Sequence, residues 1–320
     1  MSLTLLQYQQ FDNFYSESDI SATVILDSTY FDQNDVRLLT MELVIPQMIH
    51  AELIRHRSFS FSISSQRSVR FEKALNDTYF VPRFRTKGKG MQPGGFCSDE
   101  EQTFYSSEWL YLRQEAISIA ESLNSSGVAK EIVNRLLFPW QTIKVLVTGT
   151  ETAFNSFIKL RNHPDAKFEI QVLARRVEKA IENSEPTILN QGEWHTPYIR
   201  FSETGLPKEI QIATSVARCA RTSYKLTGTN MDSKLEKDVE LFSKLISEPI
   251  HASPLEHVAT PVPDYIIYKN ALPNNVSSNW YGNFGSTFVQ LRKFFELSPE
   301  TENFSREVVT TTKMVKDMIN

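Results

Sequence analysis

The sequence contains little cysteine and no long apolar run. Its 320 residues include only two cysteines, Cys97 and Cys219, which lie far apart and show no CxxC spacing. This scarcity disfavours both a zinc site and a disulfide framework. No uninterrupted apolar run approaches the roughly 20 residues that span a bilayer, and the N-terminus lacks a basic start followed by an apolar core. We therefore expect a cytoplasmic protein without a membrane partner.

An excess of positive charge is also missing. Lys and Arg number 34 against 38 Asp and Glu, which gives a formal net charge of -4. Such a balance provides no broad cationic field for a nucleic acid polymer or an anionic membrane. Any anionic ligand must therefore meet a local cluster of basic residues. With 41% hydrophobic and 22% charged residues, the chain can form one large domain or two ordinary ones.

Apolar periodicity alternates along the chain between strand-like and helix-like segments. Short β-branched runs predict two strands, and apolar residues at helical spacing predict several helices. Glycine and proline predict a long loop over residues 82–98. The mixture predicts an α/β (α+β) fold. The strands are expected at 36–44 and 142–147, and the helices at 47–57, 101–123, 128–137, from about 150 to 161, and at 235–246.

A compact basic cluster lies at the C-terminal end of the first predicted helix. Arg55, His56 and Arg57 precede a serine-rich run at 58–65 in which apolar residues alternate, and Arg67 follows two residues after Ser65. Guanidinium forks and hydroxyls together match the oxygens of a phosphate. The alternative is a solvated basic turn. Because apolar segments flank the cluster, we favour a partly buried anion site, and the serine-rich run is expected to be an extended segment or a loop whose hydroxyls line a ligand.

The segment HASPLEH, residues 251–257, predicts the start of a helix. Ser253 at the N-cap, Pro254 at the first helical position and Glu256 three residues after the cap would form a capping box. The cap does not explain His251 and His257, but an isolated histidine pair is more often structural than a metal site. No third ligand is evident, so we predict no metal site here.

These segments resemble motifs of the flavin-dependent thymidylate synthases. The hallmark of that family is Arg-His-Arg, seven residues and then Ser, which matches residues 55–57 and Ser65, with Arg67 at the usual offset. Four further segments resemble family motifs: VNRLLFP with Arg135, LRNHPDAKFEIQ with Arg161, RCARTSY, and HASPLEH.

The order of these motifs differs from the common form of the family. There, the counterparts of RCARTSY and HASPLEH precede Arg-His-Arg, whereas here they come last. This order is similar to that of permuted, longer variants from bacteriophages, which also share pieces like EWHTPY and GNFGSTFVQLRK. The resemblance implies an N-terminal lead at 1–35, a single domain at 36–300 with a permuted segment at about 208–293, and a tail at 301–320.

The resemblance also implies a structure and an activity. The fold would be a homotetrameric α/β arrangement with a central mixed sheet flanked by helices. The enzyme would bind FAD, take reducing equivalents from NADPH and move a one-carbon unit from methylenetetrahydrofolate to C5 of dUMP, in the host cytoplasm if the protein is viral. The flavin carries the hydride in such enzymes, so no protein nucleophile is required.

Site residues carry over from the resemblance by position. Arg161 matches the activating arginine of the family, which can stabilise negative charge developing on the pyrimidine. Arg135 and Arg161 can also be interpreted as helix caps, and Ser65 as a turn residue. The nucleotide contacts would be Glu52, Ser65, Arg67, Arg135 and Arg161, and the FAD contacts Arg55, His56, Arg57, His251, Ser253 and Glu256.

Several positions depart from the family pattern. Glu52 and Lys167 stand where the family has glutamine, and Ser62 and Ile63 stand where it often has Asn-Glu. An apolar side chain at residue 63 cannot hydrogen-bond to flavin or nucleotide. These departures leave two alternatives: a related enzyme that acts on another pyrimidine nucleotide, such as dCMP, or by hydroxymethylation, and a protein that binds flavin or nucleotide without catalysis.

Overall fold

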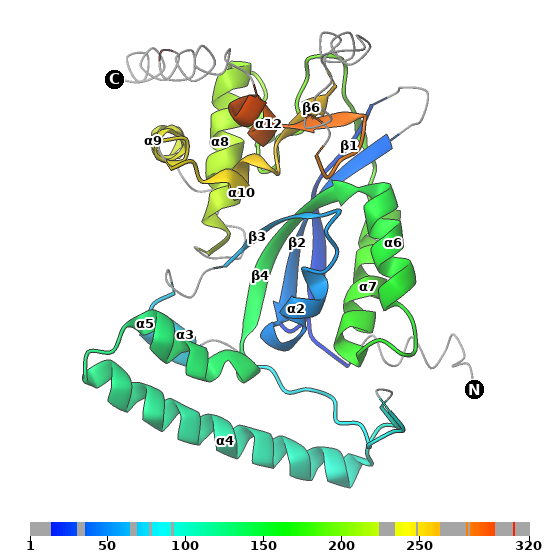
Figure 1. Ribbon diagram of the computed structural model, residues 1–320, viewed down its shortest axis with the longest axis vertical. Helices are drawn as coiled ribbons and strands as arrows, with labels where there is room; N and C mark the ends of the chain where they lie inside the picture. The colour runs from blue at the N-terminus through cyan, green and yellow to red at the C-terminus, as the bar shows by residue number, and fades with distance from the viewer. Residues whose placement is uncertain are drawn as a thin grey trace.

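The computed structural model describes residues 14–30, 36–64, 69–76, 79–90, 93–223, 234–247, 249–262, 280, 282–297 and 310. Its centre is a five-stranded sheet with the strand order β3-β4-β2-β1-β5 (Figure 1). All neighbours pair antiparallel except β1 and β5, which are parallel. The strands are β1 (Ser21–Tyr30), β2 (Val36–Pro46), β3 (Ser60–Ile63), β4 (Thr142–Thr150) and β5 (Thr187–Ile188), and a small second sheet joins β6 (Ala259–Pro261) to β7 (Phe288–Gln290).

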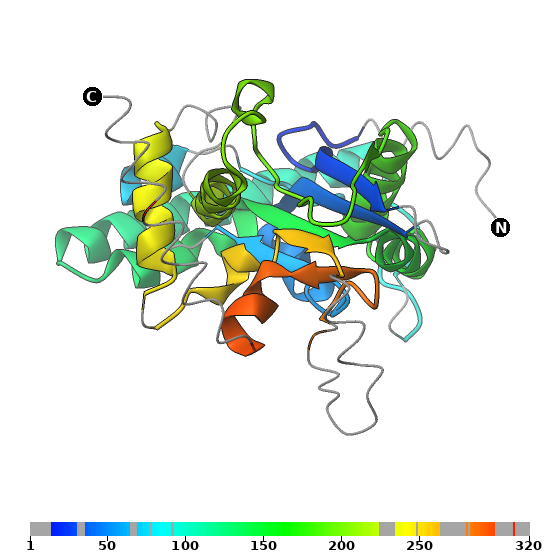
Figure 2. The same ribbon diagram turned by 90° about the horizontal axis from the view of Figure 1, so that it is seen from above.

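Helices lie on both faces of this sheet. Helices α6 (Glu151–Arg161) and α7 (Phe168–Glu182) cover one face, whereas α8 (Lys208–Ala220), the later helices and the small sheet lie on the other (Figures 1 and 2). The long helix α4 (Asp99–Ser125) lies beyond one end of the sheet. The remaining helices are η1 (Gln47–Ile49), α2 (His50–Leu53), α3 (Phe71–Asn76), α5 (Lys130–Val133), η2 (Asn134–Trp140), η3 (Phe201–Glu203), η4 (Arg221–Ser223), α9 (Leu235–Leu245), α10 (Ala252–Leu255) and α12 (Leu291–Leu297). This arrangement confirms the predicted α/β fold with a central mixed sheet flanked by helices.

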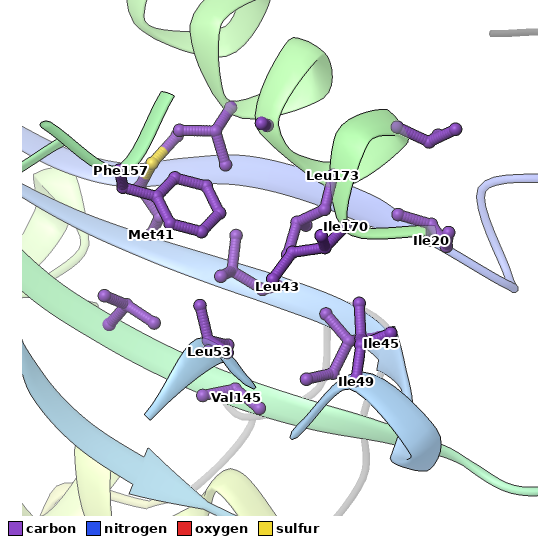
Figure 3. Packing of buried hydrophobic residues seen from close by; sticks show 14 of the residues in the cluster. Ile20, Met41, Leu43, Ile45, Ile49, Leu53, Val145, Phe157, Ile170 and Leu173 are labelled. Atoms are coloured by element: carbon purple, nitrogen blue, oxygen red, sulfur yellow. The ribbon is translucent and has the colours of Figure 1, made fainter. Parts of the chain in front are cut away.

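Successive side chains of strand β2 point to opposite faces of the sheet, and both faces are covered by other parts of the protein. Met41 and Leu43 pack with Phe157 of α6 and Leu173 of α7 in the largest hydrophobic cluster (Figure 3). The buried side chain of Thr40, in contrast, lies on the other face of the sheet, where its hydroxyl contacts His195. A buried hydroxyl needs a hydrogen-bond partner, so the second face of the sheet requires polar groups from the layer above it.

Most of the predicted elements are confirmed by the structure. The strands at 36–44 and 142–147 are β2 and β4, and the helices at 101–123, 150–161 and 235–246 are α4, α6 and α9. The helix expected at 128–137 is instead α5 followed by the 3-10 helix η2, which includes Pro139. A proline cannot donate a helical hydrogen bond, so a tighter helix replaces the regular one there.

The helix expected over residues 47–57 is shorter than predicted. It consists of η1 and the four-residue α2, which ends at Leu53. The amide of His56 donates to the carbonyl of Leu53 rather than to that of Glu52. The Glu52 carbonyl instead accepts a hydrogen bond from Arg161 at 3.2 Å. A tertiary contact therefore ends the helix and turns the basic residues out of it.

The capping box expected at Ser253 is wrong. The short helix α10 has His251 at its N-cap, no side chain caps it, and Ser253 lies within it. The Glu256 carboxylate forms an ion pair with Arg292 of α12 instead of reaching back to the backbone. The competing cation explains the difference, because a carboxylate bonds more strongly to a guanidinium than to an amide.

The sheet extends to the N-terminal side of residue 36, where we expected the domain to begin. Strand β1 pairs with β2 except at Ile25, where the register shifts between Val24 and Leu26. The polar character of this segment reflects an edge position, with only two residues of β5 on its far side. Cys97 and Cys219 are both buried and free, so the two form no disulfide.

Candidate functional site

The predicted catalytic arginine lies against the basic cluster. Thr150 caps α6, and the burial of Phe154 and Phe157 fixes the face that this helix turns to the sheet. Arg161 at its last position donates through Nε to Nε2 of His56 at 2.8 Å. Folding therefore joins two residues that are 105 positions apart in the sequence.

His56 is held as a neutral ring. Burial, with a smaller effect from the charge of Arg161, lowers the pKa of its imidazole to about 4. Because Nε2 accepts a hydrogen bond from Arg161, the ring proton must be on Nδ1. The ring also packs edge-on against Phe157, with centroids 5.0 Å apart. His56 thus orients the guanidinium of Arg161 without competing for its ligand.

The two arginines on either side of His56 are exposed. Among the residues that the structure describes, neither Arg55 nor Arg57 has a hydrogen-bond or ion-pair partner. An unpaired guanidinium offers a planar set of donors that fits a phosphate or carboxylate. The turn at 55–57 therefore presents two unpaired cations beside an oriented Arg161.

Glu52 and Lys167 form an ion pair in this site. The Glu52 carboxylate lies 2.6 Å from Nζ of Lys167, which is the N-cap residue of α7. The Glu52 side chain is largely buried, with 17% exposed, whereas that of Lys167 is half exposed. The lysine therefore neutralises a carboxylate that would otherwise repel an anionic ligand near Arg161.

The HASPLEH segment reaches the same region from the other end of the chain. Helix α10 packs against β3, the strand that follows the Arg55–Arg57 turn. Gln290 links the two, since its Nε2 donates to Oγ of Ser60 at 2.7 Å and to the carbonyl of Glu256 at 3.1 Å. His251 and Ser253 are exposed, whereas the Glu256 carboxylate is occupied by Arg292.

Part of the serine-rich run forms strand β3, and other parts of the protein cover both faces of this strand. Phe61 and Ile63 pack against the large hydrophobic cluster. Ser60 and Ser62 point to the opposite face, where Gln290 and His257 bind their hydroxyls. The expectation that these two hydroxyls line a ligand is therefore wrong. Strand pairing with β4 buries them.

The remaining predicted site residues are not brought to this cluster in the part of the chain that the structure describes. Arg135 lies exposed on η2, which packs against η1. Ser65 and Arg67 lie outside the described residues. Within the described ranges, no group of three His, Cys, Asp or Glu side chains is placed to hold a metal ion, and no helix is long and apolar enough to cross a membrane.

The sequence motifs gave no role to three residues of this region. Lys167 was visible only as a departure from the family pattern, and Gln290 and Arg292 lie in the piece GNFGSTFVQLRK. That piece signalled a relationship but no role, because the partners of these residues lie in distant segments.

The comparisons with known proteins agree with these motifs. A family model named Thy1, described as "Thymidylate synthase complementing protein", matches residues 36–187. Residues 36–187 are therefore similar to the Thy1 family. The Thy1 segment contains Glu52, the turn at 55–57, Arg135 and Arg161, whereas the HASPLEH segment lies beyond it.

One curated relative and two solved structures are each similar to about half of this chain. A probable flavin-dependent thymidylate synthase of Paramecium bursaria Chlorella virus 1 is 24% identical over 161 residues, which are 50% of this chain and 73% of the relative. Two crystal structures of the UMP/dUMP methylase PolB from Streptomyces cacaoi have 20% and 21% identity and TM-scores of 0.45 and 0.43. They cover 51% and 52% of this chain and 89% and 91% of theirs, and contain 5-Br UMP and 5-Br dUMP respectively.

Proposed function

We propose that this protein is an FAD-dependent thymidylate synthase. It would convert dUMP to dTMP, with methylenetetrahydrofolate as the one-carbon donor and NADPH as the reductant. The observation that carries the proposal is the contact of Arg161 with His56 inside the Thy1 segment. It joins the family's activating arginine to its Arg-His-Arg motif.

The residues present fit the phosphates of FAD. Arg55 and Arg57 are exposed and have no partner among the described residues, so their guanidinium groups are free to bind a pyrophosphate. His251 and Ser253 are exposed on α10, which packs beside β3. When bound, the flavin supplies hydride transfer, and the task of these side chains is to hold and orient it.

Arg161 fits a role at the nucleotide. Its Nε and one terminal nitrogen are fixed by His56 and by the Glu52 carbonyl, and the other terminal nitrogen has no partner among the described residues. A donor that is oriented in advance stabilises charge that develops during a reaction. Ser65, Arg67 and Arg135 stay proposed nucleotide contacts, together with Glu52 and its partner Lys167.

The decisive experiment is a product assay with purified protein. FAD, NADPH, methylenetetrahydrofolate and each pyrimidine monophosphate in turn are supplied, and the product is read by mass. We expect a flavin absorbance spectrum, NADPH oxidation stimulated by dUMP, and dTMP as the product. The absence of flavin binding by the purified protein would contradict the proposal.

A second candidate is a related enzyme that modifies another pyrimidine, for example dCMP, or that transfers a hydroxymethyl group. Ile63 favours it, because the position where the family often has glutamate holds a partly buried apolar side chain that packs against the hydrophobic core. A product from dCMP, or a mass increase that corresponds to hydroxymethylation, would support this candidate. Tight flavin binding without any product would indicate a binding protein that has lost catalysis.

Two matched variants separate the roles of the arginines. Arg57→Ala should weaken FAD binding by about 2 kcal/mol, or roughly thirtyfold, because it removes a charged hydrogen-bond donor. Arg161→Ala should leave FAD binding nearly unchanged and abolish product formation. Each variant is the control for the other. Unchanged FAD affinity in the first, or retained turnover in the second, would contradict the assigned role.

The homotetramer is also proposed. Large apolar side chains are exposed along α4, as expected of a surface that another subunit covers. Light scattering during gel filtration measures the assembly directly, and a monomer would contradict the proposal. The exposed residues are Phe104, Tyr111, Leu112 and Ile119.

A further inference from the structure

A continuous set of buried polar side chains crosses the face of the sheet that meets the later part of the chain. All six residues are at most 6% exposed, and five hydrogen bonds link them in a row. We call this set the buried polar relay. In order it is Ser28, His195, Thr40, Thr148, His257 and Ser62, with successive distances of 2.8, 2.8, 2.6, 2.8 and 3.0 Å.

The relay joins two layers of the molecule. Its hydroxyls come from four neighbouring strands, β1, β2, β4 and β3, and Thr40 lies directly opposite Thr148 in the register of β2 and β4. Its two imidazoles come from later segments: His195 precedes η3, and His257 follows α10. Backbone hydrogen bonds between His195 and Ala259 bring those two segments together.

The protons of the relay are coupled. Each hydroxyl and each neutral imidazole carries one proton to donate, so every group must donate to one neighbour and accept from the other. If His195 had its proton on Nε2 and His257 on Nδ1, one threonine hydroxyl between them would be buried without an acceptor. In the opposite mixed arrangement both threonines would donate to the rings, and no proton would lie between their two oxygens, which are 2.6 Å apart. Both histidines must therefore carry their proton on the same ring nitrogen.

Both ends of the relay are buried: Ser28 is 1% exposed and Ser62 is 6% exposed. The donors run in one direction along the whole row. They run either from Ser62 to Ser28 with the proton on Nδ1 of both rings, or from Ser28 to Ser62 with the proton on Nε2 of both rings. Burial keeps the rings neutral, lowering the pKa of each to about 3.

The relay ends on the strand that positions the anion-binding turn. Strand β3 pairs with β4 alone, so only one of its edges is held by a strand. Side chains from the later part of the chain hold the rest of it, through His257 to Ser62 and through Gln290 to Ser60. Because β3 begins three residues after Arg57, a shift of β3 moves the turn.

We propose that His257 and His195 are positioning residues. The relay fixes both rings in the same tautomer, and His257 in turn fixes β3, and with it the turn at 55–57, against the C-terminal segment. The shared tautomer follows from the geometry alone, whereas the consequence for flavin rests on the proposed function.

Nitrogen-15 NMR of the full protein with labelled histidine tests the coupling. We expect both rings to be neutral and protonated on the same ring nitrogen at pH 7. Thr40→Val should change the signals of His257, which Thr40 does not touch, whereas Thr214→Val should leave them unchanged, since the buried Thr214 hydroxyl has no partner in the structure. Ser28→Ala, a smaller change at the far end, should have the same effect as Thr40→Val. Different tautomers, a charged ring, or unchanged His257 signals in both relay variants would overturn the proposal.

Flavin binding tests the positioning role. Ser62→Ala should raise the dissociation constant of FAD about fivefold, as expected for the loss of one hydrogen bond, and Ser62→Thr, which keeps the hydroxyl, should restore it. Turnover per bound flavin should not change. Equal FAD affinity in Ser62→Ala and the unsubstituted protein would overturn this role. If the unsubstituted protein binds no FAD, the proposed function fails instead, and the NMR result decides the relay by itself.

Discussion

Glu52 and Lys167 each stand where the related family has glutamine, and their side chains meet at 2.6 Å. Two departures that look unrelated in the sequence are therefore partners in the structure. The pair lies beside Arg161, whose guanidinium donates to the Glu52 carbonyl. A carboxylate introduced at this place would oppose an anionic ligand, and the lysine offsets its charge.

Single and double substitutions should reveal this compensation. Lys167→Gln leaves the Glu52 carboxylate unpaired and should weaken dUMP binding about threefold, whereas Glu52→Gln together with Lys167→Gln should restore it. We expect a coupling free energy of about 0.5–1 kcal/mol, because the lysine is half exposed and solvent screens the pair. Calorimetric titration of the nucleotide measures this value. Strictly additive effects of the two substitutions would show that the residues act independently.

Among the elements, α8 is fixed by one fully buried arginine. Arg218 donates to both oxygens of Glu203 in η3 at 2.7 Å, to Asp238 in α9 at 3.0 Å and to the carbonyl of Tyr198. Burial opposes the ionisation of Glu203, but the hydrogen bonds from Arg218 outweigh it and hold the pKa of this carboxyl below its ordinary value. The arginine thus joins three segments of the C-terminal layer.

Removal of this arginine should be strongly destabilising. Arg218→Ala removes one guanidinium from the fully buried Asp238, which keeps its ion pair with Arg221, and it leaves Glu203 without its main partner. We therefore expect a loss of about 3–5 kcal/mol in the free energy of unfolding. Urea denaturation measures it. Lys244→Ala, which breaks an exposed pair with Glu240, is the control and should cost at most about 0.5 kcal/mol. A loss below about 1 kcal/mol for Arg218→Ala would contradict the structural role.

At the scale of the whole molecule, two fully buried histidines join the sheet to the C-terminal layer. The pKa of each is lowered to about 3 by burial, and the charge of His257 lowers that of His195 further. An unfolded histidine has a pKa near 6.5. Between about pH 6.5 and pH 3 the unfolded chain therefore binds more protons than the folded one, and stability must fall as the pH falls.

Acid should weaken the fold through these residues. From pH 7 to pH 5 we expect the two histidines to lower the free energy of unfolding by about 4 kcal/mol together, because each takes up a proton only on unfolding. Chemical denaturation across this range gives the slope. His195→Asn should reduce the slope by about one proton, and His163→Asn, on the surface, is the control. An identical slope in the unsubstituted protein and His195→Asn would show that His195 titrates equally in both states.

The sequence by itself determined most of the elements and the residues that we propose to carry the chemistry. Apolar periodicity is a local property, so it located β2, β4, α4, α6 and α9 without knowledge of their neighbours. The same holds for the motifs: Arg55, His56, Arg57 and Arg161 stand at spacings that the related family shares. Net charge and composition likewise required any anion to meet a local cluster.

Only the tertiary structure decided which polar groups meet. His56 forms a hydrogen bond with Arg161, and Ser62 forms one with His257, while Glu52 forms an ion pair with Lys167. Each pair joins residues that are too far apart in the sequence for a local pattern to reveal. The capping box at Ser253 failed for the same reason, since a distant arginine took the carboxylate. A buried polar group must be satisfied by whatever packing brings to it, and packing of separated segments is a property of the folded chain alone.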